Sequence, residues 1–224
     1  MNTTSKTQKI YHNHRENQLE RILEAAEKLF IRDGIDNVSI GAIATAARIS
    51  RKTLYEYFSN KQEIAWAIIQ ALTDEKTSTF KPPSLPEGSG YQRVEAFMLH
   101  MVNMLEAYPD HIRFISEFNN LYAREGDPAR VRQVFARGGD ELIPMIRQGI
   151  ADGSICPEVD PGFLAAAIFN LVSGMNSRFA LLGDQIGVEY GRPALELYRE
   201  ICRTFLRGIC SSPAARENPG SWNK

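Results

Sequence analysis

Apolar residues recur at steps of three and four along most of the chain, which is the pattern of amphipathic helices. From residue 19 onward, Ile22, Ala26 and Phe30 fall on one face and predict a first helix with one buried side. Gly34 is expected to end that helix, because glycine accepts a left-handed conformation. No stretch alternates with period two for long enough to predict a strand. The pattern therefore predicts an all-α fold.

Polar capping residues divide the next part of the chain into short helices. Ser39 is expected to cap a helix over 40–46, and Ser50 a second helix over 51–58 after a short turn. Asn60 is expected to cap a longer helix that follows directly and reaches residue 75. Two helices of about seven residues cannot form a core alone, so they must pack against the helices before and after them.

Proline and glycine separate the remaining helices. Residues 81–90 are dense in proline, glycine and serine and predict a linker. Beyond it the periodicity predicts five more helices, over residues 91–107, 109–124, 127–151, 160–183 and 190–209.

Composition and charge narrow the class of protein. Hydrophobic residues make up 43% and charged residues 24%, which is ordinary for a soluble globular protein. No apolar run approaches the roughly 18 to 20 residues that cross a bilayer, and the polar start lacks a secretory signal. The three cysteines fit no metal-ligand spacing and suit a reducing cytoplasm. We therefore expect a cytoplasmic protein with no membrane partner, no metal and no cofactor.

The net charge of −1 does not by itself indicate a nucleic-acid ligand, so the distribution of charge matters more. Residues 1–64 carry ten Lys and Arg against eight Asp and Glu, a modest excess of cations. The second short helix leaves cationic, hydroxyl and aromatic side chains mostly outward, at Arg51, Lys52, Thr53 and Tyr55. A short helix with such a face suits insertion into the major groove of duplex DNA.

Residues 22–64 resemble the DNA-binding domain of the TetR family of bacterial regulators. The matching positions are Ala25, Ala26, Leu29, Phe30, Gly34, Ser39, Ile43, Ala44, Ala47, Ser50, Thr53, Leu54, Tyr55, Tyr57, Phe58 and Lys61. The rest of the chain resembles the family in length and helical character. The resemblance implies a flexible tail (1–18), a helix-turn-helix domain (19–64), a helical effector-binding and dimerisation domain (65–210) and a disordered tail (211–224).

The resemblance also implies roles for individual side chains. Contacts to phosphates, which fix the register of the recognition helix, are expected from Ser39, Thr53, Tyr55, Tyr57 and Lys61. Arg51 and Lys52 are candidates for base edges, most simply O6 and N7 of guanine. Ser50 is expected to act as a helix cap, a base contact or both.

One position departs from the family pattern. The turn between the two short helices usually carries glycine, and here it carries Arg48. A side chain in a left-handed conformation costs about 1 kcal/mol relative to glycine. Either the turn differs or Arg48 offsets that cost by reaching a phosphate, and we predict the phosphate contact.

The resemblance further implies a homodimer that binds two half-sites of a near-palindromic duplex, through the helices at 160–183 and 190–209. Residues 91–151 would enclose a small-molecule effector. The residues expected to line its site form a methionine and aromatic stripe, which could equally be ordinary core: Phe97, Met98, Met101, Met104, Phe114, Phe118 and Tyr122. Repression with release by the effector is the outcome that the resemblance favours, and activation stays open because no residue decides between the two.

Two other classes of function stay open at this point. A helical protein-interaction module, or a regulator without an effector, would keep the fold without ligand-controlled DNA binding. An all-helical enzyme is the more distant alternative, because the chain contains no Walker loop, no GxGxxG after a strand, no HExxH and no Cys-x-x-Cys.

Overall fold

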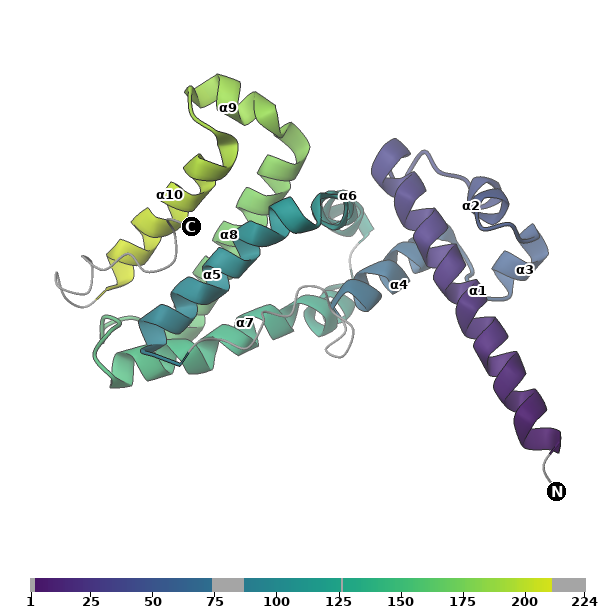
Figure 1. The fold of residues 1–224 in the computed structure, drawn as a ribbon, viewed down its shortest axis with the longest axis horizontal. Coiled ribbons are helices and arrows are strands. Elements are labelled where there is room, and N and C mark those ends of the chain that lie inside the picture. Colours follow the sequence, from purple (N-terminus) through teal and green to yellow (C-terminus); the bar gives the residue numbers. More distant parts are fainter. Residues whose placement is uncertain (1–2, 74–86, 126, 211–224) are drawn as a thin grey trace. The chain divides into compact units, whose positions relative to one another are not determined.

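A computed structural model describes residues 3–73, 87–125 and 127–210 of the chain. These ranges contain ten α-helices and no β-strand, which confirms the predicted all-α class (Figure 1). Within the same ranges, no helix combines the length and the apolar run that a bilayer crossing requires. The predicted tail at 211–224 lies outside the described residues.

Contacts between residues divide the structure into two units. The N-terminal unit comprises α1 to α4 together with residues 117–125 of α6, and the C-terminal unit comprises the remaining elements. Helix α4, Lys61–Thr73, therefore belongs with the helix-turn-helix rather than with the domain expected from residue 65 onward. The physical reason is that α4 packs on α1 and buries an apolar face that includes Ile64, Ile68 and Ile69.

Helix α1, Thr3–Asp33, is longer than the sequence pattern predicted. Residues 3–18, expected to form a flexible tail, continue the helix without a break, and no proline or glycine interrupts them. The helix ends at the predicted place. Gly34 has φ of 80°, and its amide donates to the Phe30 carbonyl at 2.9 Å, so this residue closes the last turn.

The two short helices are α2, Ile40–Ala46, and α3, Arg51–Tyr55. Helix α3 is shorter than the predicted 51–58, because the chain leaves the helix in a turn whose Tyr57 amide donates to the Leu54 carbonyl at 3.0 Å. Helix α2 packs on α1 and α3 packs on α2, and the three helices share a small apolar core. Its fully or nearly fully buried members include Ile22, Ala26, Phe30, Ile43, Ala44, Ala47 and Leu54.

The C-terminal unit begins with α5, whose start is strongly specified by the sequence. The other helices are α6, Pro109–Glu125, α7, Pro128–Ala151, α8, Pro161–Leu182, α9, Asp184–Tyr190, and α10, Ala194–Ile209. Helix α5, Gly90–Ala107, opens with a capping box in which Ser89 and Gln92 bond each other's backbone. The predicted helix 190–209 begins later, at Ala194, because Gly191 is left-handed (φ 65°) and Pro193 precedes the first turn.

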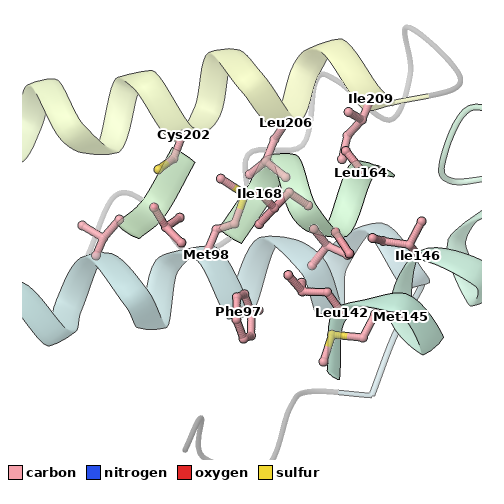
Figure 2. Packing of buried hydrophobic residues seen from close by; sticks show 14 of the residues in the cluster. Phe97, Met98, Leu142, Met145, Ile146, Leu164, Ile168, Cys202, Leu206 and Ile209 are labelled. Atoms are coloured by element: carbon pink, nitrogen blue, oxygen red, sulfur yellow. The ribbon is translucent and has the colours of Figure 1, made fainter. Parts of the chain in front are cut away.

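Helices α5, α7, α8 and α10 surround the main core of the C-terminal unit. Figure 2 shows side chains from all four helices meeting in this core, with Phe97 and Met98 from α5 facing Leu142 and Met145 from α7 and Ile168 from α8. Each of these five residues is at most 5% exposed. The core is therefore formed by one apolar stripe from each helix.

Two glycines allow α5 and α7 to approach closely. A Cβ built on Gly90 would lie 2.0 Å from the Gly149 amide nitrogen, so no side chain fits at that crossing. Asp152 at the end of α7 fixes the same junction by accepting from the Gly90 amide at 2.8 Å and the Ser154 amide at 3.0 Å. Burial alone would raise the pKa of the Asp152 carboxyl, but hydrogen bonds from Ser154 and Gly90 hold it below its ordinary value.

Candidate nucleic-acid interface

The turn between α2 and α3 carries a strained residue at the predicted position. Arg48 has φ of 56°, and it is the only residue other than glycine with positive φ in the described part of the chain. The turn is closed by the Arg48 amide on the Thr45 carbonyl at 3.1 Å and by the Ile49 amide on the Ala44 carbonyl at 3.0 Å. Of the two alternatives for this position, the turn therefore keeps the left-handed conformation, and the contact of Arg48 with a phosphate stays a prediction. Arg21 of α1 also supports it by donating to the Ala47 carbonyl at 2.5 Å.

Both predicted serine caps are present. The Ser39 hydroxyl accepts from the Ala42 amide at 3.1 Å, and the Ser50 hydroxyl accepts from the Thr53 amide at 3.0 Å. The Ser50 and Thr53 hydroxyls also lie 2.9 Å apart. Each serine thus fixes the start of its helix, and Ser50 further ties the orientation of the Thr53 hydroxyl to the first turn of α3.

Helix α3 presents a polar face and buries a single anchor. Leu54 is fully buried, whereas Arg51 and Lys52 are exposed and Tyr55 is 58% exposed. An exposed tyrosine beside two cations supplies the donors and the flat apolar surface that phosphates and base edges can use. The Arg51 guanidinium lies against the backbone of α2 at Gly41, a contact that periodicity does not indicate.

Tyr57 makes contacts within the protein that the sequence did not reveal. Its hydroxyl donates to the Gln18 side chain at 2.8 Å, and the Arg15 guanidinium lies 5.5 Å from the centre of its ring. Gln18 and Arg15 lie in the segment that was expected to be a flexible tail. The phenol therefore has a fixed orientation, and its oxygen lone pairs remain available to a further donor.

Lys61 also has partners within the protein. Its ammonium donates to the Asp36 carbonyl at 2.5 Å and to the Val38 carbonyl at 3.2 Å. An ammonium has three donors, so one is left for an external acceptor such as a phosphate. The same cap that was predicted for this helix is present, with the Asn60 side chain accepting from the Glu63 amide at 2.8 Å.

A groove with cationic walls runs between α1 and the end of α2. It has a volume of about 470 Å³ and is lined by Arg21, Lys28 and Arg48, with Glu24 as the one acidic side chain among its lining residues. This surface was not predicted as a unit, because its cations come from α1 and from the turn after α2, which lie some distance apart in the sequence. Arg48 lies where an anionic group in the groove would meet two further cations.

The residues predicted to line an effector site are divided between the two units. Phe97 and Met98 belong to the main core of the C-terminal unit, with Met101 packed against it, and Met104 packs with Ile112 in a second, smaller cluster. Phe114 of the same unit is fully buried. Phe118 and Tyr122 belong to the N-terminal unit, where Phe118 contacts Trp66 of α4.

One buried polar side chain stands out in the C-terminal unit. Asn176 of α8 is 4% exposed, and its amide nitrogen donates to the Met101 carbonyl at 3.3 Å. Its side-chain oxygen is buried without a hydrogen-bond donor in the described part of the chain. A buried acceptor left unpaired costs about 1–3 kcal/mol, so a donor brought to this point would be stabilised.

Comparison with known families supports the geometry of the N-terminal unit. Residues 22–68 match the family model described as bacterial regulatory proteins, tetR family. The matched range includes the last twelve residues of α1, all of α2 and α3, and the first eight residues of α4.

Curated relatives and solved structures extend the similarity beyond that range. The nucleoid occlusion factor SlmA of Vibrio cholerae is 25% identical over 169 residues, which cover 75% of this chain and 86% of SlmA. An HTH-type transcriptional regulator of Staphylococcus aureus is 31% identical over 83 residues, 37% of this chain and 45% of the relative. The chain thus spans about half of that staphylococcal protein. A TetR transcription regulator from Haloarcula marismortui shares the fold, with a TM-score of 0.71, 18% identity and coverage of 87% and 99% of the two chains.

Proposed function

Since the chain belongs to the TetR family of bacterial regulatory proteins and is a transcriptional regulator of that family, we propose that it binds a near-palindromic operator as a homodimer and represses transcription. A small-molecule effector releases it from the DNA.

The observation that carries the proposal is the outward face of α3. Leu54 anchors the helix in the core, the Ser50 cap fixes its start, and Arg51, Lys52 and Tyr55 are exposed on it. Around it, Tyr57 and Lys61 are held in place by contacts within the unit. Preformed donors of this kind lose little freedom when they meet a phosphate backbone.

An exposed face on α8 with a large apolar residue at each end supports a homodimer. Phe163 is 78% exposed and Leu181 is 60% exposed, and between them Ala166, Asn170, Gly174 and Arg178 are exposed at helical steps. Small residues at such steps let two helices approach closely. Two half-sites about 34–36 Å apart, or a multiple of that spacing, would then be bound by one dimer. A charge at Ala166 and Gly174 is expected to give monomers in sedimentation, whereas Glu141→Arg on α7 is expected to leave the dimer intact.

The unpaired oxygen of Asn176 supports a site for an effector in the C-terminal unit. Its environment is apolar, because Phe179 and Val172 on the same helix are buried and Met101 lies beside it. The effector proposed here therefore has an apolar body and a hydrogen-bond donor. We expect Asn176→Leu to remove the thermal stabilisation by such a compound and to keep that by an analogue without the donor.

Control of DNA binding by an effector requires a coupling between two sites, typically 1–3 kcal/mol, and the coupling is reciprocal. Helix α6 is positioned for this role, because its residues 117–125 pack in the N-terminal unit while residues 109–116 belong to the C-terminal unit. Inside the N-terminal unit, Phe118 of α6 contacts Trp66 of α4. Arg124 of α6 forms an ion pair with Asp36 in the loop between α1 and α2.

The test of the proposed function is selection of the purified protein on a randomised duplex pool at two salt concentrations. An enriched near-palindrome whose affinity falls steeply with salt is expected, because each neutralised phosphate releases counterions. The variant with both Lys52→Ala and Tyr55→Ala should lose most of this binding. Arg147→Ala, which removes one exposed cation from α7, is the matched control and should retain it. A folded wild-type protein that enriches no sequence would contradict the proposal.

A further inference from the structure

Gly41 in the first turn of α2 lies directly beneath the Arg51 side chain of α3. A Cβ built on Gly41 would be 2.5 Å from Nη2, 2.8 Å from Nε and 2.9 Å from Cζ of Arg51. All three of the nearest atoms belong to that one guanidinium. The head of Arg51 therefore occupies the space that any other residue at position 41 would fill.

The backbone does not explain why position 41 is glycine. Gly41 is not among the residues with positive φ, and it lies inside a helix. In that setting glycine is a poorer helix former than alanine. The neighbouring positions in α2 carry Ala42, Ala44 and Ala46, which are good helix formers. The contact with Arg51 is the feature that distinguishes position 41.

The Arg51 guanidinium lies against Gly41 with its hydrogen-bond donors unused among the described residues. It forms no hydrogen bond and no ion pair within the described part of the chain, and it is exposed. An arginine side chain is long and loses considerable rotamer freedom when it is fixed in a complex. A guanidinium that already lies against α2 loses less of that rotamer freedom, and its N–H donors remain available to a base edge.

We propose that Gly41 is a positioning residue that sets the direction of Arg51 and thereby the base preference of the regulator. The proposal rests on the DNA binding proposed above and deepens it. A methyl group at position 41 displaces the guanidinium, so the side chain of Arg51 points in a different direction from α3. Gly41 itself needs no contact with DNA for this effect.

The experiment compares four proteins in the same duplex selection: wild type, Gly41→Ala, Arg51→Ala and the double variant. Arg51→Ala is expected to relax preference at the base pair that Arg51 reads by about tenfold or more. Gly41→Ala is expected to alter preference at that same pair. In the double variant the change at position 41 should add nothing, because its effect acts through Arg51.

Thermal unfolding of the same proteins separates positioning from a purely structural role. Gly41→Ala should match or exceed the wild-type melting temperature, because alanine favours the helix and the displaced atoms are the end of a flexible side chain. Ala42→Ser, at the next and exposed position of α2, is the control and should keep the wild-type base preference. If Gly41→Ala unfolded but the double variant folded, the clash would come from Arg51. That result would also show that Arg51 lies over residue 41.

Failure of this inference and failure of the proposed function give different results. A wild-type protein that selects a motif, with Gly41→Ala selecting the same motif with the same preferences, would overturn the positioning role alone. Effects of the two substitutions that add at the shared base pair would also overturn it. A wild-type protein that selects no sequence would remove both proposals.

Discussion

The ring of Phe118 meets the indole of Trp66 edge-on, with 4.8 Å between the ring centroids. Phe118 on α6 is fully buried and Trp66 on α4 is 8% exposed, and both belong to the N-terminal unit. Sequence periodicity grouped Phe118 with the methionine and aromatic stripe of α5, because both lie on apolar helix faces. The structure places it beside α4 instead, so its first role is to join α6 to the core of the helix-turn-helix unit.

Phe118→Ala is expected to lower the free energy of unfolding by about 3–5 kcal/mol, because it leaves a cavity beside Trp66. Urea titration followed by tryptophan fluorescence measures this. Val188→Ala is the control, since Val188 on α9 is 86% exposed and lies outside the α8 face proposed for the dimer, so its loss should change the free energy of unfolding by less than about 0.5 kcal/mol. Equal effects of the two substitutions would contradict the packing role of Phe118.

Arg48→Gly is expected to separate backbone strain from phosphate binding. Removing the side chain at φ of 56° should relieve about 1 kcal/mol, partly offset by the greater entropy of glycine in the unfolded chain. Operator affinity should nevertheless fall, and the slope of log affinity against log salt should decrease by about 1.8, because the homodimer loses one phosphate contact in each subunit. Arg48→Asn keeps tolerance of the left-handed conformation and should show the same loss of slope. An unchanged slope in both variants would rule out the phosphate contact.

Gly90→Ala is expected to disrupt the crossing of α5 and α7. The added Cβ would lie 2.0–2.4 Å from backbone atoms of Gly149 and Met145, which cannot rotate away as a side chain can. Overpacking costs about 1–3 kcal/mol when side chains can adjust, so a backbone clash should reach at least the upper end. Differential scanning calorimetry measures the loss of stability. Ser89→Ala is the comparison: it removes only the cap of α5 and should cost about 1 kcal/mol. A Gly90→Ala variant as stable as wild type would show that the two helices can separate there.

Stability is expected to fall in alkaline solution because of buried acids in the C-terminal unit. Burial raises the pKa of the Cys202 thiol to about 12, and burial with the nearby Glu95 charge raises the pKa of Tyr91 to about 12. These groups hold their protons in the folded state at pH values where the unfolded chain releases them. Their contribution is therefore complete below about pH 8.5 and is lost as the pH rises toward 12.

Urea titrations at pH 8, 9.5 and 11 measure this loss. Cys202→Ala should give a shallower decline between pH 9 and 10 than wild type, because unfolded cysteine titrates before tyrosine. Cys156→Ala is the comparison: this thiol is only partly buried, and its hydrogen bond to Glu158 at 2.8 Å also raises its pKa, so a smaller change in the same direction is expected. A Cys202→Ala variant with the wild-type decline would show that this thiol does not contribute.

The parts of the fold that depend on neighbouring residues could be predicted from the sequence. Caps at Ser39, Ser50 and Asn60 follow from side chains within one turn of the chain. The helix after residue 190 was placed too early, because periodicity carried across Gly191 although that residue ends α9.

Contacts between distant helices could not be predicted in the same way. Periodicity identifies which face of a helix is apolar, but not which helix covers that face. The division of α6, the bond from Tyr57 to Gln18 and the position of Arg51 over Gly41 all depend on tertiary packing. For this reason the predicted phosphate and base contacts rest on family resemblance, whereas the internal partners of Tyr57 and Lys61 emerged only from the structure.

The two hydrogen bonds from Lys61 to the carbonyls of Asp36 and Val38 determine which segment must be transferred when this DNA-binding unit is exchanged between regulators. Val38 directly precedes the Ser39 cap, so the first residue of α4 is bonded to the loop from which α2 begins. A chimaera that joins a foreign helix-turn-helix to this α4 within residues 36–61 would remove these hydrogen bonds. A graft that carries residues 3–73 together with residues 117–125 of α6 would keep both bonds and the packing of Phe118 on Trp66, and would transfer the operator choice of this protein to a new sensor.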